Sequence, residues 1–173
     1  RYPSSEHDVL QNISFKVNKG ETIAFIGATG SAKTTLVSLA ARLYDVTDGE
    51  VLIDGINIKD YTFDALYDKI GYVTQRAVLF SGTIIDNINF GESSAPVSDD
   101  NTWRALELAQ ATEFVEKMPG GINAEISQGG TNVSGGQKQR LSIARAIARQ
   151  PEILVFDDSF SALDYKTDAN LRA

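Results

Sequence analysis

Residues 27–35 read GATGSAKTT, a stretch that combines glycines, hydroxyl side chains and one lysine. It lies between a short apolar run at 22–27 and a segment with helical spacing at 36–45, so the pattern predicts a loop between a strand and a helix. Such a loop aims backbone N–H groups and a helix N-terminus at one point. The sequence therefore predicts a binding site for an anion, and the glycines favour a phosphate.

Individual residues of this loop suit a nucleoside triphosphate. Gly27 and Gly30 permit tight backbone geometry close to phosphates. Lys33 can reach the β- and γ-phosphates, and Thr34 can offer its hydroxyl to Mg²⁺. The pattern G-x-x-x-x-G-K-[ST] would place a further glycine at position 32, where this chain has Ala32. The extra methyl group is tolerable if φ of that residue is negative and costly if φ is positive.

Two adjacent carboxylates end a second apolar run, in the stretch VFDDSFSALD at 155–164. The pattern places Asp157 at the C-terminal end of a buried strand, where open α/β sheets bind their ligands. There one carboxylate can hold Mg²⁺, usually through water. Asp158 leaves the strand on the other side and can orient or deprotonate an attacking water. The alternative for Asp158 is a loop carboxylate with little chemistry.

The rest of the chain must position these groups. Alternating or apolar runs predict strands, and 3.6-residue spacing predicts helices. The predicted strands lie at 9–17, 22–27, 50–55 and 69–75 and within 151–158, and the predicted helices at 36–45, 102–118 and 138–150. Strand and helix alternate at both ends, with a helical insert between them. The predicted fold class is therefore α/β with a parallel sheet.

Composition narrows the classes of function. A chain of 173 residues with 42% hydrophobic residues fits one domain with a core, or a large part of one. The net charge of -7 disfavours a nucleic-acid partner. There is no cysteine, which excludes disulfides and thiolate metal sites. No apolar run approaches the roughly 18–20 residues that cross a bilayer, so we expect a soluble piece.

The stretches GATGSAKTT, YVTQ, VSGGQKQRLSIARAI and ILVFDDSFSALD, in this order, resemble the nucleotide-binding domain of ABC transporters. The likeness covers essentially the whole chain, and SGGQ before an arginine-rich helix is highly specific. Residues 79–91 are similar to exporter-type members, and residues 126–137 to exporter subunits that work as unequal pairs. The resemblance implies a P-loop NTPase core at about 1–80 and 138–173, with an N-terminal antiparallel β part and a helical subdomain at about 83–137, before the signature motif.

The resemblance also implies a role for individual residues. Tyr2 would stack on adenine, although it can also be a plain edge-strand tyrosine. Gln75 would touch Mg²⁺ or the attacking water, although it can also be a polar strand-end residue. The residues implied to bind ATP are Tyr2, Gly27, Ala28, Thr29, Gly30, Ser31, Ala32, Lys33, Thr34 and Thr35. The implied metal ligands are Thr34, Gln75 and Asp157, and the implied catalytic residues are Asp158 and Gln75.

Two further motifs imply partners. Ser134, Gly135, Gly136 and Gln137 match the signature motif, a helix N-terminus that suits the γ-phosphate of ATP bound on a partner domain. Ser161, Ala162, Leu163 and Asp164 match a loop that crosses the dimer interface. The resemblance thus implies a head-to-tail dimer holding ATP and Mg²⁺. It also implies a transmembrane domain contacted through the region from Gln75 to Gly91, at the cytoplasmic face of a membrane.

The chain departs from the family pattern at the second carboxylate and at its end. The usual catalytic glutamate is replaced by Asp158, which retracts the carboxylate by on the order of 1 Å, and a misplacement of that size can lower a rate about a hundredfold. The family's switch histidine lies downstream of the interface loop, beyond the last residue of this sequence. We therefore expect a slow site in a C-terminally truncated domain.

Three functions fit these residues. The first is the ATP-hydrolysing domain of an exporter, as one half of an unequal, heterodimeric pair. The second is a regulatory clamp that binds ATP with negligible hydrolysis. The third is a soluble ABC-type ATPase, against which the acidic charge and the exporter-like segment at 79–91 speak.

Overall fold

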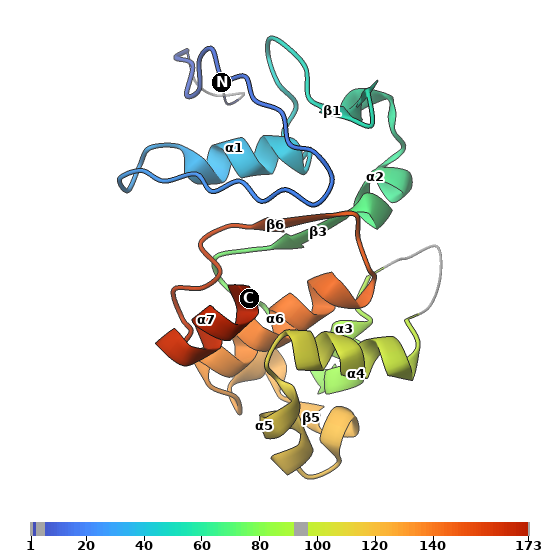
Figure 1. Cartoon of the computed structure of the whole chain (residues 1–173). Coiled ribbons are helices and arrows are strands. Elements are labelled where there is room, and N and C mark those ends of the chain that lie inside the picture. Colours follow the sequence, from blue (N-terminus) through green and yellow to red (C-terminus); the bar gives the residue numbers. More distant parts are fainter. Residues whose placement is uncertain (1, 3–5, 92–96, 173) are drawn as a thin grey trace. The chain divides into compact units, whose positions relative to one another are not determined.

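The computed structural model describes residues 2, 6–91 and 97–172 (Figure 1). The chain divides into two compact units, Arg1–Thr62 and Phe63–Ala173. Within the described ranges, every helix is too short or too polar to span a bilayer. The division into a core and a helical subdomain stays a prediction, and residues 92–96 of that subdomain lie outside the described residues.

The first unit contains a helix and a short hairpin. Its elements are α1 (Lys33–Ala40), β1 (Leu52–Ile53), β2 (Ile56–Asn57) and the 3₁₀ helix η1 (Ile58–Asp60). β1 and β2 pair in antiparallel register around a turn at Asp54 and Gly55. Both turn residues have positive φ, 53° and 78°, as a two-residue hairpin turn of the Asp-Gly type requires.

The strands predicted at 9–17 and 22–27 are not formed, which corrects the sequence-based assignment. Alternating apolar residues identify a chain that can lie half-buried in a sheet, but a strand also needs a neighbour for its backbone hydrogen bonds. Neither segment pairs with another strand, and Ile13 and Ile26 are 53% and 96% exposed. A local aromatic contact is present instead, with the rings of Phe15 and Phe25 packed edge to face.

The second unit contains the predicted parallel strand pair. β3 (Ile70–Val73) runs parallel to β6 (Ile153–Phe156), with Val73 opposite Phe156. The backbone N–H of Asp157 extends this pairing by donating to the carbonyl oxygen of Val73 at 2.9 Å. Because both strands end at the same edge, the residues that follow them are brought together there.

Helices build most of the buried core of the second unit. Its other elements are α2 (Phe63–Lys69), β4 (Gly82–Thr83), α3 (Ile84–Ile88), α4 (Asp99–Leu108), α5 (Thr112–Lys117), η2 (Gly121–Asn123), β5 (Glu125–Ile126), η3 (Gln128–Gly130), α6 (Gly135–Ala148) and α7 (Tyr165–Arg172). α6 packs against α3, α4 and β3 (Figure 1). The fully buried side chains Leu106, Leu141 and Ile143 belong to one hydrophobic cluster, so α6 is the central helix of this unit.

Two predicted helices end earlier than the sequence indicated. The helix predicted at 36–45 stops at Ala40, and the helix predicted at 102–118 is broken into α4 and α5. In each case the residue after the C-cap is left-handed, with φ of 51° at Arg42 and 55° at Gln110. The N–H of the next residue then bonds back five positions, from Leu43 to Ser38 and from Ala111 to Leu106. This helix-ending motif usually contains glycine, so neither stop was visible in the sequence.

Candidate functional site

The predicted phosphate loop curls around its own lysine. The Lys33 ammonium donates to the carbonyl oxygens of Gly27 and Ala28, at 2.8 and 2.9 Å, and to the hydroxyl of Ser31 at 3.2 Å. The loop is tight at Gly27, because an added Cβ there would lie 2.6 Å from Oγ of Ser31. The loop therefore brings the Lys33 ammonium, the Ser31 hydroxyl and the N-terminus of α1 close together, as anion binding requires.

Ala32 takes the backbone conformation that the sequence marked as costly. It is the N-cap of α1 with φ 63° and ψ 25°, in the left-handed region, and its side chain provides no cap. An L-residue with a Cβ pays about 1–2 kcal/mol there, which glycine avoids. The methyl group at position 32 therefore strains the loop at the point where the phosphate-loop pattern has glycine.

Tyr2 lies beside the start of α1. Its hydroxyl shares a 2.9 Å hydrogen bond with the hydroxyl of Thr35, and its ring packs edge-on against Tyr44 at 5.0 Å between centroids. The ring thus belongs to the surroundings of the phosphate loop within the first unit. Its stacking on adenine stays a prediction.

Asp157 lies at the carboxyl end of β6, as predicted, and its residue is only 9% exposed. The hydroxyl of Tyr72 approaches Oδ2 of Asp157 at 3.4 Å. Ser159 donates its hydroxyl to the carbonyl oxygens of Val73 and Asp157, at 2.8 and 3.3 Å. The backbone around Asp157 is therefore fastened to the end of β3, which places its carboxylate at the strand edge where a metal ligand is expected.

Gln75 and Asp158 are brought into contact, although 83 positions separate them. Nε2 of Gln75 donates to Oδ2 of Asp158 at 3.0 Å. The backbone of Asp158 is left-handed, with φ 47°, and its carbonyl oxygen accepts from the Ser161 hydroxyl at 3.1 Å. Aspartate tolerates this conformation better than most residues with a Cβ. The backbone conformation at position 158 therefore favours an aspartate there, independently of any chemical role of its carboxylate.

The signature residues form a helix N-terminus. Ser134 is the N-cap of α6, and its hydroxyl accepts from the N–H of Gln137 at 3.3 Å. Gln137 returns the contact, with Oε1 accepting from the N–H of Ser134 at 2.8 Å. The first N–H groups of a helix have no acceptor within the helix, so Gly135 and Gly136 present theirs outward along its axis. This end of α6 is suited to an anion.

The predicted interface loop lies next to the signature residues. A Cβ built on Gly136 would lie 3.2 Å from the carbonyl oxygen of Ala162, so a larger residue would crowd this contact. Asp164 accepts from the hydroxyl and the N–H of Thr167, at 2.7 and 3.0 Å. The hydrogen bond from the Thr167 hydroxyl, and to a smaller extent the one from its N–H, lowers the pKa of the Asp164 carboxyl. The second unit thus places the signature and the loop side by side.

Several polar residues of this unit were missed by the sequence reasoning. Gln139 is 2% exposed and donates to the carbonyl oxygen of Thr74 at 3.3 Å, one residue before Gln75. Its position on the same helix face as Ser142 and Ile143, at spacings of three and four, was an available signal. Asn87, also 2% exposed, had no such signal, because its contact with Arg145 of α6 joins positions 58 apart in the sequence.

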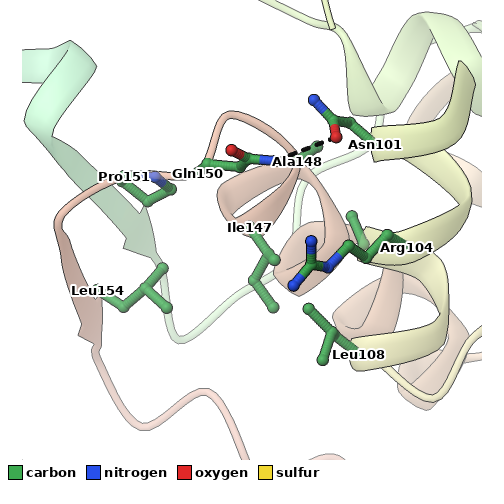
Figure 2. A pocket seen from close by; sticks show the side chains of 9 residues that line it. Asn101, Arg104, Leu108, Ile147, Ala148, Gln150, Pro151 and Leu154 are labelled. Carbon is green, nitrogen blue, oxygen red and sulfur yellow. Dashed lines mark hydrogen bonds between the residues drawn. The ribbon is translucent and has the colours of Figure 1, made fainter. Parts of the chain in front are cut away.

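The cavity of about 300 Å³ in the second unit is separate from these residues. It lies between α4, the end of α6 and the start of β6, and Figure 2 shows Ile147 between Leu154 and Arg104. At its rim Gln150 donates to Asn101 at 3.0 Å. None of the residues predicted to bind nucleotide lines it, so this cavity is not the candidate site.

Comparison with known proteins fits this geometry. A family model described as ABC transporter matches residues 10–161. The chain belongs to the ABC transporter family.

Relatives in the ABC transporter family are longer than this chain. An uncharacterised ABC transporter ATP-binding protein of Mycobacterium bovis is 50% identical over 99% of the chain, and a putative multidrug export ATP-binding/permease protein of Staphylococcus aureus is 43% identical over 98%. The chain spans 29% of the length of each. A solved structure of a bacterial Atm1-family ABC exporter with ATP bound matches 83% of this chain and 25% of its own, with a TM-score of 0.76 and 37% identity. This chain is therefore an ABC transporter ATP-binding domain, a class that hydrolyses ATP in general.

The residues present fit ATP and Mg²⁺. Mg²⁺ is usually held by one or two carboxylates together with phosphate oxygens and waters, not by a cage of side chains. The described residues contain no group of three or more acidic, histidine or cysteine side chains that could hold a metal. Thr34 in the first unit and Asp157 in the second each offer a hard oxygen donor of the kind that Mg²⁺ prefers.

Proposed function

We propose that this chain is the ATP-hydrolysing domain of an exporter-type ABC transporter, and that its own site is slow. The observation that carries the proposal is the 3.0 Å contact from Gln75 to Asp158, at the strand edge where Asp157 also lies. A side-chain amide and a carboxylate that meet at one strand edge can both hydrogen-bond to one water molecule placed beside them. That is the arrangement needed to direct a water at a γ-phosphate.

Each of these residues has its own task in the proposed reaction. Lys33 exchanges its bonds to loop carbonyls for bonds to the phosphates of ATP. Asp157, with Thr34, holds the metal, and Mg²⁺ neutralises charge on the phosphates when bound. Asp158 accepts a hydrogen bond from the attacking water, and Gln75 orients that water. Because aspartate is one methylene shorter than glutamate, Asp158 reaches the water less well, and the step is slow.

The signature end of α6 serves a second domain in this proposal. Ser134 and the outward N–H groups of Gly135 and Gly136 take the γ-phosphate of ATP bound by the partner. The loop around Ala162, adjacent to Gly136, crosses the interface. The pair works head to tail and is unequal, so the partner supplies the faster site. The names of the relatives, which include a multidrug export ATP-binding/permease protein, support an attached transmembrane domain, contacted through Gln75 to Gly91 at the cytoplasmic face.

The decisive experiment is steady-state Mg-ATP hydrolysis by the full-length transporter pair, with the partner's site disabled. Asp158→Glu should raise the rate, by up to about a hundredfold. Lys33→Ala sets the baseline, because it should abolish both tight ATP binding and turnover. Thermal unfolding of each variant controls for the left-handed backbone at position 158. An unchanged, substantial rate would mean that aspartate suffices and that the slow-site proposal is wrong.

The assignment of the signature residues needs its own test. Ser134→Ala should slow turnover at the partner's site and leave turnover at this chain's own site unchanged. Each site is isolated by disabling the phosphate-loop lysine of the other. The reverse result would contradict the head-to-tail arrangement. The rival function, a clamp that binds ATP with negligible hydrolysis, would be favoured by tight binding without turnover even after Asp158→Glu.

A further inference from the structure

Arg145 fastens the segment 78–91 to the signature helix. The residue lies in the last turn of α6, and each of its guanidinium nitrogens has an acceptor in that segment. Nε donates to the carbonyl oxygen of Asn87 at 2.7 Å, Nη1 to the carbonyl oxygen of Val78 at 3.0 Å, and Nη2 to Oδ1 of Asn87 at 3.1 Å. These acceptors occupy the fork of a planar donor group, which a lysine ammonium cannot reproduce.

The segment 78–91 also has internal hydrogen bonds, centred on Asn87. Asn87, which is buried, accepts from the N–H of Phe80 at 2.8 Å and donates to its carbonyl oxygen at 2.8 Å. The rings of Phe80 and Phe90 stack at 4.0 Å, and the Arg145 guanidinium lies 5.6 and 5.8 Å from their centroids. Arg149 adds bonds to the carbonyl oxygens of Phe90 and Gly91. Both ends of the segment are thus bonded to one helix.

Packing alone does not account for an arginine at this position. Within the described structure its hydrogen bonds all go to neutral oxygens, and the charge that acts on its pKa is the like charge of Arg149. Burial, and then Arg149, lower the pKa of Arg145, which is the sign of a cation held at a cost. An apolar residue would fill the same space without that cost. Unlike an apolar residue, arginine fixes the position of the segment 78–91 relative to α6 through hydrogen bonds to the backbone of the segment.

We propose that Arg145 is a positioning residue that couples the segment 78–91 to the signature end of α6. The inference rests on the proposed function, in which this segment contacts the transmembrane domain and Ser134 holds the partner's ATP. Ser134 and Arg145 lie near opposite ends of one helix, roughly 16 Å apart along its axis. A displacement of the segment by the transmembrane domain therefore moves the whole helix and reaches Ser134 without an intervening flexible link.

The test uses the full-length transporter pair in lipid nanodiscs, with cysteines outside this sequence replaced. Val78→Cys provides a reporter, because the side chain is 53% exposed and the carbonyl oxygen that Arg145 uses is retained. The rate of maleimide labelling is measured without nucleotide and after trapping with Mg-ATP and orthovanadate. In the otherwise unmodified protein, trapping should change the labelling rate. In Arg145→Lys that change should shrink by about threefold or more, while the amount of trapped nucleotide stays the same.

Arg140→Lys is the matched control. Arg140 lies on the same helix, donates to the carbonyl oxygen of Gln110 at 2.7 Å and lies 4.8 Å over the Phe114 ring. It has the same chemistry with a different partner, so its variant should keep the full labelling response. If Arg145→Lys does not assemble, Arg149→Lys replaces it, with a smaller loss in the same direction.

The outcomes separate the inference from the proposed function. A full response in Arg145→Lys, or in Arg149→Lys where that variant replaces it, overturns the inference and leaves the proposed function standing. An equal loss in Arg140→Lys also overturns it, since the cause is then a general loosening of α6. Failure to trap nucleotide in the unmodified protein removes the proposed function and the inference together. If nucleotide is trapped but the labelling rate of Val78→Cys does not change, the coupling and the proposed transmembrane contact are both wrong, whereas ATP binding still stands.

Discussion

The phosphate loop and the strand-edge region are held in opposite ways. In the loop, Lys33 bonds to atoms two to six positions away, all within GATGSAKTT. At the strand edge, Gln75 reaches Asp158 across 83 positions, and Ser159 reaches Val73 across 86. The first geometry is encoded in a continuous motif, whereas the second exists only after two distant strands have paired.

This difference predicts different sensitivities to mutation. A loop held by its own bonds responds to changes in its own backbone and is largely indifferent to packing elsewhere. A region assembled from distant segments responds to any change that prevents β3, β6 and α6 from approaching one another. Substitutions that act on backbone conformation and on packing can therefore be used to test the comparison directly.

The largest effect is expected for Gly71→Ala, at the place where β3 meets its neighbours. An added Cβ would lie 2.8 Å from the carbonyl oxygen of Ala146, 2.8 Å from Pro151 and 2.9 Å from Leu154. The first of these is backbone of α6 and cannot move without shifting the helix. We expect a loss of about 2–3 kcal/mol in the free energy of unfolding, as overpacked sites show. Calorimetry of the full-length protein measures it.

Gly135→Ala is the control for that substitution. A Cβ at Gly135 would meet no atom within 4 Å, and its φ is not positive. Alanine is also a better helix former than glycine, so the change in the free energy of unfolding should be within about 0.5 kcal/mol. If Gly71→Ala is tolerated as well as Gly135→Ala, the strand edge is not defined by close packing, and the comparison between the two regions fails.

A smaller effect, in the stabilising direction, is expected for Ala32→Gly in the phosphate loop. Glycine removes the left-handed strain at φ 63°, so the free energy of unfolding should rise by about 1 kcal/mol. The affinity for Mg-ATP should rise too, because the loop no longer resists the conformation that it needs. Equilibrium binding and thermal unfolding measure the two changes.

Ala28→Gly is the matched control in the same loop. Ala28 is not in the left-handed region, so glycine there only adds freedom to the unfolded chain and should lower stability. Equal responses at positions 28 and 32 would mean that the strain at Ala32 is not what limits the loop. The sign of the difference, and not its size, decides the matter.

Several features of the fold were predictable because they depend on local or periodic patterns. The apolar runs at 69–75 and 151–158 are the parallel pair, and the predicted helix at 138–150 is α6, extended backward to Gly135 by the Ser134 cap. The turn at Asp54 and Gly55 is present as well. Each is determined by residues that are adjacent in sequence or spaced by one structural period.

Other features depended on information that the sequence pattern does not carry. The run at 9–17 has the alternation of a half-buried strand and the run at 22–27 the apolar character of a buried one, but neither has a partner strand in the described structure. The break at Gln110 uses a left-handed residue that is not glycine, so nothing marked it. The contacts of Arg145 with Asn87 join positions 58 apart. A pattern of residue types identifies what a segment can do, and the tertiary neighbours decide whether it does so.

The smallest effect is expected for the contact between Thr167 and Asp164, which is local in sequence although it lies in the unit whose strand edge is held by long-range contacts. Thr167→Val removes the hydroxyl that donates to Asp164 at 2.7 Å and keeps the N–H that donates at 3.0 Å. The hydroxyl is the largest cause of the lowered pKa of Asp164, so this pKa should rise toward its ordinary value. Carbonyl NMR of protein labelled with ¹³C-aspartate follows the titration.

The sign of the pH dependence follows from that shift. A carboxyl whose pKa is lower in the folded state stabilises the fold above its unfolded pKa, and this contribution is lost as the pH falls through the folded pKa. In Thr167→Val the pKa of Asp164 in the folded state is higher, so its stabilising contribution is smaller and is lost at a higher pH than in the unmodified protein. Because the bonds of Asp164 span only three positions, the hydrogen bond between Gln75 and Asp158 should remain in Thr167→Val. A change in the side-chain amide resonances of Gln75 would show instead that local and distant contacts in this region act as one network.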